Sequence, residues 1–154
     1  MDSTVGAVKA ALNRARTKLA AAPAPSKTTR SVDPELTRVM KLYVDRFNRR
    51  DWDGVRELIS ADARLTVADA FVGKLADAPY SRNYERFSTP WKLAVGEVDG
   101  EPVVIILQRG VDTLTPYSIV RLSVIGQHID RVVDYVHCPW VISIADSVTV
   151  VAHP

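Results

Sequence analysis

The spacing of apolar residues predicts two helices at the front of the main domain. Asp33-Pro34 is a pair typical of a helix start, and Asn48-Arg49-Arg50 is the expected end. A second, shorter helix is expected to begin at Asp51 or Trp52. The residues that recur with helical spacing are Leu36, Val39, Met40, Tyr43, Val44 and Phe47 in the first helix and Val55, Leu58 and Ile59 in the second.

The pattern changes to strands further along the chain. Residues 64–72 alternate in part and predict a strand, and residues 80–87 predict one more short helix. Asp99-Gly100 lies between strands expected at 91–98 and 102–107, which is a strong hairpin signal. A second hairpin is expected from strands at 117–125 and 129–137, joined through Gly126-Gln127-His128.

The central strand is apolar on both faces, as Val103-Val104-Ile105-Ile106-Leu107 shows. One face should therefore pack on helices, while the other lines a cavity or meets a partner. Helices followed by strands predict an α+β domain in which the helices pack on a curved antiparallel sheet. We expect this domain to span residues 33–146 and a tail to follow at 147–154.

The first thirty residues differ from the rest of the chain in predicted structure and in charge. Residues 1–19 predict a helix with an apolar stripe, and residues 20–32, with Pro23 and Pro25, predict a linker. Residues 1–30 contain six basic residues and one acidic residue, whereas residues 31–154 contain 14 basic and 17 acidic residues. The overall net charge of +2 is thus the sum of a basic arm (+5) and a mildly acidic body (−3).

Composition narrows the class of protein. With 154 residues the chain is long enough for one domain of ordinary size. No apolar run is long enough to span a membrane. Cys138 is a single cysteine and cannot form an internal disulfide, so a cytoplasmic location is expected.

Residues 3–19, Ser-Thr-Val-Gly-Ala-Val-Lys-Ala-Ala-Leu-Asn-Arg-Ala-Arg-Thr-Lys-Leu, resemble the recognition helix in region 4 of extracytoplasmic-function (ECF) sigma factors of RNA polymerase. The resemblance implies that Ser3, Thr4 and Lys9 lie near promoter DNA and that Arg14 and Arg16 contact its backbone. The helix that should brace this one against DNA is missing before Met1. We therefore expect the chain to be the C-terminal part of a longer sigma factor that binds promoters only weakly by itself.

The body resembles the SnoaL-like, or nuclear-transport-factor-2-like, fold over roughly residues 35–145. The sequence phrases that carry this resemblance lie at 43–53, 62–65, 96–102 and 134–141. In this fold, long helices close a cone-shaped sheet. The phrases are similar to the domain attached to the C-terminus of certain ECF sigma factors. That likeness implies a non-enzymatic regulatory domain that contacts the sigma core domains and RNA polymerase.

Other members of this fold are isomerases and polyketide cyclases, which hold an acid–base pair inside an apolar cavity. The candidates for such a pair are Asp69, Asp134 and His137, although Asp69 also fits a solvent-exposed loop. On one strand, Asp134 and His137 would point to opposite faces, which argues against a dyad built from these two. We expect no catalytic constellation, no metal site and no cofactor. The aromatic candidates for lining a pocket, which could equally be core residues, are Tyr80, Tyr84, Trp91, Tyr135 and Trp140.

Three hypotheses for function follow. The first is the sigma-factor regulatory domain, and the second is a small-molecule-binding protein or an enzyme of cyclase or isomerase type. The third is a binding module that forms a homodimer through the exposed face of its sheet. A deep cavity with a buried carboxylate hydrogen-bonded to tyrosine or histidine would favour the enzyme. A cone filled by aromatic side chains would count against it.

Overall fold

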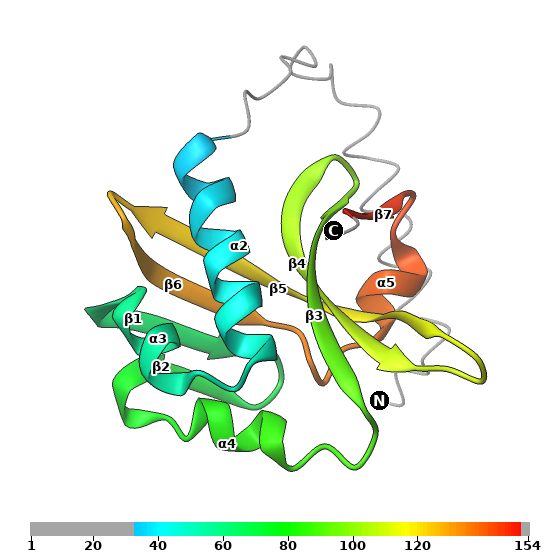
Figure 1. Cartoon of the computed structure of the whole chain (residues 1–154), viewed down its shortest axis with the longest axis horizontal. Coiled ribbons are helices and arrows are strands. Elements are labelled where there is room, and N and C mark those ends of the chain that lie inside the picture. The colour runs from blue at the N-terminus through cyan, green and yellow to red at the C-terminus, as the bar shows by residue number, and fades with distance from the viewer. Residues whose placement is uncertain (1–32, 152–154) are drawn as a thin grey trace, which may run out of the picture. The chain divides into compact units, whose positions relative to one another are not determined.

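A computed structural model describes residues 33–151, and the chain divides into two units between Ser31 and Val32. The expected recognition helix at 1–19 and the linker at 20–32 lie outside the described residues, as do residues 152–154 of the expected tail. The following description concerns the second unit only (Figure 1).

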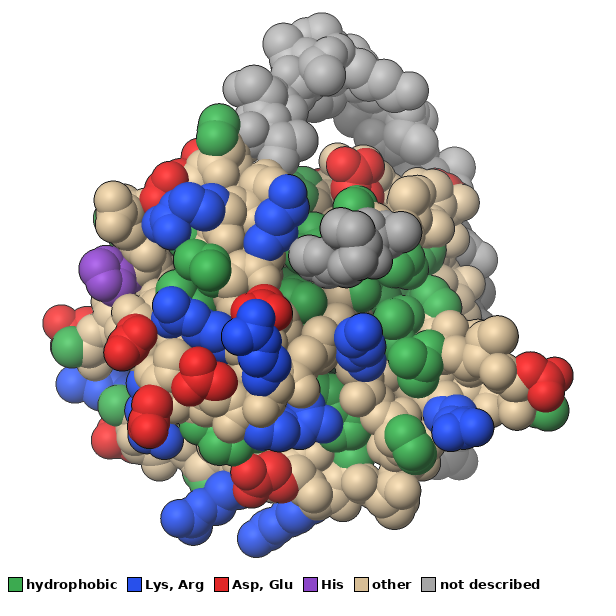
Figure 2. Space-filling view, in the orientation of Figure 1, with side chains coloured by type: hydrophobic (Ala, Val, Ile, Leu, Met, Phe, Trp, Pro, Cys, Tyr) green, Lys and Arg blue, Asp and Glu red, His purple; other side chains and the backbone are tan. Residues whose placement is uncertain are grey.

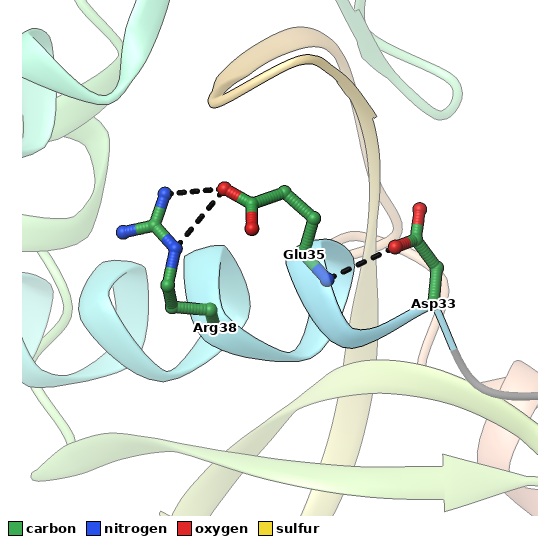
Figure 3. Close-up of polar contacts among 3 residues, drawn as sticks. All are labelled: Asp33, Glu35 and Arg38. Atoms are coloured by element: carbon green, nitrogen blue, oxygen red, sulfur yellow. Dashed lines mark hydrogen bonds and ion pairs between the residues drawn. The ribbon is translucent and has the colours of Figure 1, made fainter.

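Helix α2 (Pro34–Asn48) forms where the sequence predicts it. The Asp33 carboxylate caps the first turn by accepting a hydrogen bond of 2.9 Å from the backbone N–H of Glu35 (Figure 3). One turn on, Arg38 bonds to the Glu35 side chain at 2.6 Å on the exposed face. The opposite face packs into the core through Val39, Met40, Tyr43, Val44 and Phe47.

Three short helices follow, two of them close to expectation. Helix α3 (Trp52–Glu57) is capped by Asp51, and helix α4 (Tyr80–Glu85) follows a 3₁₀ turn, η1 (Leu75–Asp77). Ile59 was expected on the face of α3 but instead opens a strand. Helix α5 (Trp140–Ile144) was not predicted.

Seven strands form a single sheet in the order β2-β1-β6-β5-β4-β3-β7. The first strand of the chain, β1, pairs with β6 in parallel, and every other neighbouring pair in the sheet is antiparallel. The sheet is therefore mixed, which corrects the expectation of a purely antiparallel one. Its strands are β1 (Ile59–Val67), β2 (Phe71–Lys74), β3 (Trp91–Val98), β4 (Glu101–Arg109), β5 (Leu114–Ile125), β6 (His128–Asp134) and β7 (Val148–Val150).

Two strand predictions need correction. The single strand expected at 64–72 is a hairpin of β1 and β2, and Asp69 in its turn has the left-handed φ of 66°. Strand β6 ends at Asp134, so His137 lies in the turn after the strand. The alternation argument that separated Asp134 from His137 therefore does not apply, because it needs both residues on one strand.

The hairpin predicted at Asp99-Gly100 is confirmed. Both residues have positive φ, 52° and 80°, as a two-residue turn of type I′ requires. The Asp99 carboxylate also accepts hydrogen bonds from the backbone N–H groups of Asp146 and Ser147, at 2.7 and 2.9 Å. These bonds connect the turn to β7, which pairs with β3 and lies within the segment expected to be a tail.

Both faces of the sheet are covered over β4. The larger core lies on the α2 face and includes Val104 and Ile106. On the opposite face Val103 and Ile105 form a smaller core, where residues of α5 and β7 pack on them. The second face was expected to line a cavity or to meet a partner. At β4 it is covered by the C-terminal part of the same domain (Figure 1).

Candidate functional site

A buried carboxylate lies at the end of β6. The Asp134 side chain is completely inaccessible to solvent. Its Oδ2 accepts hydrogen bonds from the hydroxyls of Tyr80 and Tyr84, both at 2.6 Å, and its Oδ1 accepts the backbone N–H of Val136 at 2.8 Å. Three donors thus compensate the carboxylate for the water it has lost.

Helices α4 and α2 bring the tyrosines to this point. Tyr80 and Tyr84 stand four residues apart on α4, so their side chains lie on the same face of the helix. Tyr43 from α2 extends the network, with its hydroxyl 3.2 Å from that of Tyr80. We call these four residues, Tyr43, Tyr80, Tyr84 and Asp134, the tyrosine–aspartate cluster.

Burial dominates the electrostatics of the cluster. It raises the pKa of Asp134, because the charged carboxylate is penalised away from water. The bonds from Tyr80 and Tyr84, the Val136 N–H and the charge of His137 act in the opposite direction. Burial and the nearby carboxylate also raise the pKa values of Tyr80 and Tyr84 well above their ordinary value, so both phenols keep their protons as donors.

Aromatic rings fill the space between α2, α4 and β3. The Phe47 ring packs against Tyr84 with ring centres 5.0 Å apart and against Trp91 at 5.7 Å. The Trp91 indole N–H donates to the Tyr84 backbone carbonyl at 2.9 Å. The centre of the cone is therefore filled by aromatic side chains, which counts against a catalytic cavity there.

A pocket of about 330 Å³ remains beside this packed region, and Tyr80 forms part of its wall. The lining is mainly apolar, with Arg56, Ser60 and Ser81 as further polar side chains. The pocket lies between α3, the start of β1, η1 and the start of α4. Its apolar lining is Phe47, Trp52, Val55, Ile59, Ala61, Leu75, Ala76 and Ala78.

The structure separates the pocket candidates proposed from sequence into three groups. Tyr80, Tyr84 and Trp91 are buried together in the larger core. Tyr80 lines the pocket described above, whereas Tyr84 and Trp91 border other hollows. Tyr135 packs on the smaller core of the opposite face. Trp140 and His137 are exposed.

The exposed turn residue Asp69 stands apart from the cluster. Its carboxylate oxygen lies 3.4 Å from the Cys138 Sγ, which donates to it. In the part of the chain that the structure describes, no group of three or more His, Cys, Asp or Glu residues could hold a metal ion.

The sequence analysis named Asp134, Tyr80 and Tyr84 but did not predict that the two tyrosines bond to the carboxylate. The spacing of Tyr80 and Tyr84 was the available signal, since i and i+4 on a predicted helix share a face. Nothing local indicated that this face meets the end of a strand some fifty residues later. The contribution of Tyr43 from α2 was missed for the same reason.

No protein-family model matches the chain, and no curated protein matches it. Among solved structures, a candidate ketosteroid isomerase from Kribbella flavida is 21% identical, with a TM-score of 0.48, over 64% of this chain and 75% of that one. A candidate polyketide cyclase from Xanthomonas campestris is 20% identical, with a TM-score of 0.47, over 70% and 95%. A nuclear-transport-factor-2-like protein with a cystatin-like fold from Novosphingobium aromaticivorans is 13% identical, with a TM-score of 0.42, over 86% and 90%.

These comparisons correct one expectation and leave another without support. The expectation of a domain that is not an enzyme is contradicted by the names of the similar structures, which are those of an isomerase and of cyclases. The match to sigma region 4 rests on residues 3–19, which lie outside the described residues, and no comparison supports it. No helix within residues 33–151 is long and apolar enough to cross a membrane.

Proposed function

We propose that the domain binds a small, mainly apolar molecule with a carbonyl group and activates that group through the Tyr80 hydroxyl, as an enzyme of isomerase or cyclase type. One observation carries the proposal. Tyr80 lines the pocket and also donates a hydrogen bond to the buried carboxylate of Asp134. It is the residue that connects the pocket to the tyrosine–aspartate cluster.

The protonation state of Asp134 decides what Tyr80 can donate. When Asp134 is ionised, its Oδ2 accepts the protons of both Tyr80 and Tyr84, and neither proton is available to a ligand. When Asp134 is neutral, its own O–H can donate to the Tyr80 oxygen, and the Tyr80 proton can turn toward a ligand. The raised pKa of Asp134 favours this neutral form.

The proton transfer then involves the cluster, the ligand and water. The Tyr80 O–H bond breaks as a new O–H bond forms on the carbonyl oxygen of the ligand, which becomes an enol as it loses a proton from the adjacent carbon to water. The proton held by Asp134 replaces the one that Tyr80 has given, and solvent later restores it. Hydrogen-bond donation to an oxygen on which negative charge develops is a strong form of catalysis.

The pocket suits such a ligand in size and lining. Its volume of about 330 Å³ is at the lower end of the range for small-molecule sites. Trp52 and Phe47 supply flat aromatic surface, and Ser60 and Ser81 supply hydroxyls that can orient a polar substituent. A ketone with one or two fused rings meets these requirements.

The test uses 2-tetralone, a bicyclic ketone with exchangeable hydrogens beside its carbonyl. Exchange of those hydrogens for deuterium in heavy water is followed by NMR for the full chain and for Tyr80→Phe. Tyr135→Phe is the matched control, because Tyr135 packs on the opposite face of the sheet. We expect the full chain to accelerate exchange and the control variant to accelerate it equally. The acceleration by Tyr80→Phe should be about 100-fold smaller.

Binding of the ketone is measured in the same samples by chemical-shift titration. Saturable binding with no accelerated exchange would overturn the enzymatic part of the proposal and leave a binding protein. No binding by the native chain, or equal losses in Tyr80→Phe and Tyr135→Phe, would overturn the assignment of the site.

A further inference from the structure

The polar groups of the pocket differ in depth. Tyr80 is only 6% exposed, and its hydroxyl belongs to the tyrosine–aspartate cluster. Ser60 and Ser81 are half-buried. The Arg56 side chain, on α3, is 68% exposed and so lies at the mouth of the pocket. The pocket therefore has a phenol at its inner end and a cation at its outer end.

Arg56 is the only charged residue among the described residues that line the pocket. Asp62 and Asp77 are sequence neighbours of lining residues, but neither forms part of the wall. Glu57, next to Arg56 on α3, bonds instead to Arg46 at 3.3 Å. A ligand that fills the pocket therefore meets a cation at the mouth and no acidic side chain in the wall.

Part of the Arg56 guanidinium is not used by the protein. Its Nη1 donates to the Asp53 carboxylate at 3.0 Å, and within residues 33–151 its Nε and Nη2 have no hydrogen-bond acceptor. A comparable pair on α2 is different, since Arg38 bonds to Glu35 through both Nε and Nη2, at 3.1 and 2.6 Å. Nε and Nη2 together can hold a carboxylate by two parallel hydrogen bonds. In Arg56 these two donors are available to a ligand.

The surface around the mouth does not select a charged ligand by itself. Figure 2 shows acidic and basic side chains intermingled over α2 and α3. The Arg56–Asp53 pair is exposed to water, and such pairs are weak. Selectivity instead requires walls that hold a ligand with its anionic group against the guanidinium, and the apolar lining of the pocket supplies them.

We propose that the pocket takes a keto acid, an apolar ring system with a ketone directed inward to Tyr80 and a carboxylate directed outward to Arg56. The inference rests on the proposed function, which supplies the ketone, and it adds the second group and its place. A carboxylate carries one negative charge, which one guanidinium balances, whereas a phosphate monoester carries nearly two.

The outer end is tested with 2-naphthoate and 2-naphthamide, which share a shape and differ in charge. Their Kd values are measured by chemical-shift titration for the full chain, for Arg56→Gln and for Arg38→Gln. The last is the matched control, because Arg38 also pairs with an acidic residue three positions away and does not line the pocket. We expect the native chain and the control to bind naphthoate about fivefold more tightly than naphthamide. In Arg56→Gln the two Kd values should agree within about twofold, and 1 M sodium chloride should reduce the preference of the native chain.

Both ends are tested together with 6-carboxy-2-tetralone, whose ketone and carboxylate stand at opposite ends of one bicyclic ring system. In the deuterium exchange assay, Arg56→Gln should raise KM about fivefold and leave kcat within about twofold, because Arg56 binds the ligand away from the reacting carbon. Arg38→Gln should change neither constant.

The outcomes separate this inference from the proposed function. Equal binding of naphthoate and naphthamide by the native chain would overturn the role of Arg56 and leave the ketone site at Tyr80 standing. A preference for naphthoate that persists in Arg56→Gln would also overturn it, and amide shifts confined to residues 1–30 would then assign the anion to the basic arm. An Arg56-dependent preference without exchange of 2-tetralone would support the anion site and overturn the enzymatic activity alone. No binding of either compound would overturn both proposals.

Discussion

The two faces of strand β6 hold their charged side chains under opposite conditions. Asp134 points inward, is fully buried, and has three hydrogen-bond donors around its carboxylate. Arg131, three residues earlier, points outward beside Arg64 and has no ion pair among the described residues. A buried charge needs hydrogen-bond donors or a counter-charge from the protein. Water screens an exposed charge, so a neighbour of like charge costs little. The inner carboxyl group is therefore held by its hydrogen bonds, whereas the outer cations are stabilised by water.

The largest effect should come from removing the inner carboxyl group. Asp134→Ala leaves the two phenols and the Val136 N–H without their acceptor in a buried site. We expect the free energy of unfolding to fall by about 3 kcal/mol or more, measured by urea denaturation. The matched change on the outer face, Arg131→Ala, should alter it by less than about 0.5 kcal/mol. Equal losses in the two variants would contradict the comparison.

Removing one donor from the cluster should have an intermediate effect. Tyr84→Phe deletes a bond of 2.6 Å to the carboxylate, and we expect it to lower the free energy of unfolding by about 1.5 kcal/mol. Tyr43→Phe deletes only the longer contact of 3.2 Å between two hydroxyls and should cost less. Urea denaturation of both variants decides the order, and a larger loss in Tyr43→Phe would show that the carboxylate is not the centre of the cluster.

The pH dependence of stability tests the inner face separately. Below the ordinary carboxyl pKa of 3.8, Asp134 is protonated in both the folded and the unfolded chain. As pH rises past that value, the unfolded chain releases this proton while the folded chain retains it up to its raised pKa. Stability from this group should therefore fall across that window by about 1.4 kcal/mol for each unit of elevation, and then stay level. The stability of Asp134→Asn, subtracted at each pH, isolates the contribution, and a difference that rises with pH would contradict the direction.

The smallest effect is expected on the outer face, with the opposite sign. Arg64 is paired with Lys74 on β2 and with Arg131 on β6, and Arg64→Thr replaces it with a neutral residue that suits a strand. Repulsion among these three cations therefore decreases. We expect the free energy of unfolding to increase by about 0.3 kcal/mol at low salt, and the gain to shrink in 1 M sodium chloride. A loss of stability in thermal unfolding at low salt would mean that Arg64 has a structural role on this face.

The elements that sequence predicted well are those with local signals. Helix α2 follows from Asp33-Pro34 and from one helical stripe, and the β3–β4 hairpin follows from Asp99-Gly100, whose positive φ angles suit a tight turn. Helix α4 was also expected close to where it forms. In each case the decisive interactions lie within a few residues of one another.

The features that sequence missed depend on pairing between distant segments. The parallel partner of β1 is β6, and no pattern within either strand identifies the other. The outer face of β4 was expected to line a cavity or to meet a partner. Its cover by α5 was missed because α5 has too few residues for its periodicity to be recognised. The prediction of the candidate site was incomplete for the same reason. Asp134 and Tyr80 were both named, but only the fold brings the Tyr80 hydroxyl to 2.6 Å from the Asp134 carboxylate.

Strand β7 has a consequence for how the protein is made. It pairs with β3 in the finished sheet, but Val148 follows its partner Val98 by 50 residues. During synthesis, β3 can pair with β4 as soon as that strand leaves the ribosome, while the backbone groups on its other edge stay unpaired until β7 emerges. An unpaired edge is a template for association with other chains. The time for which the edge of β3 stays open to association therefore depends on how fast the last strand is translated. The hydrogen bonds from Asp146 and Ser147 to the β3–β4 turn help to hold β7 in place once it has emerged.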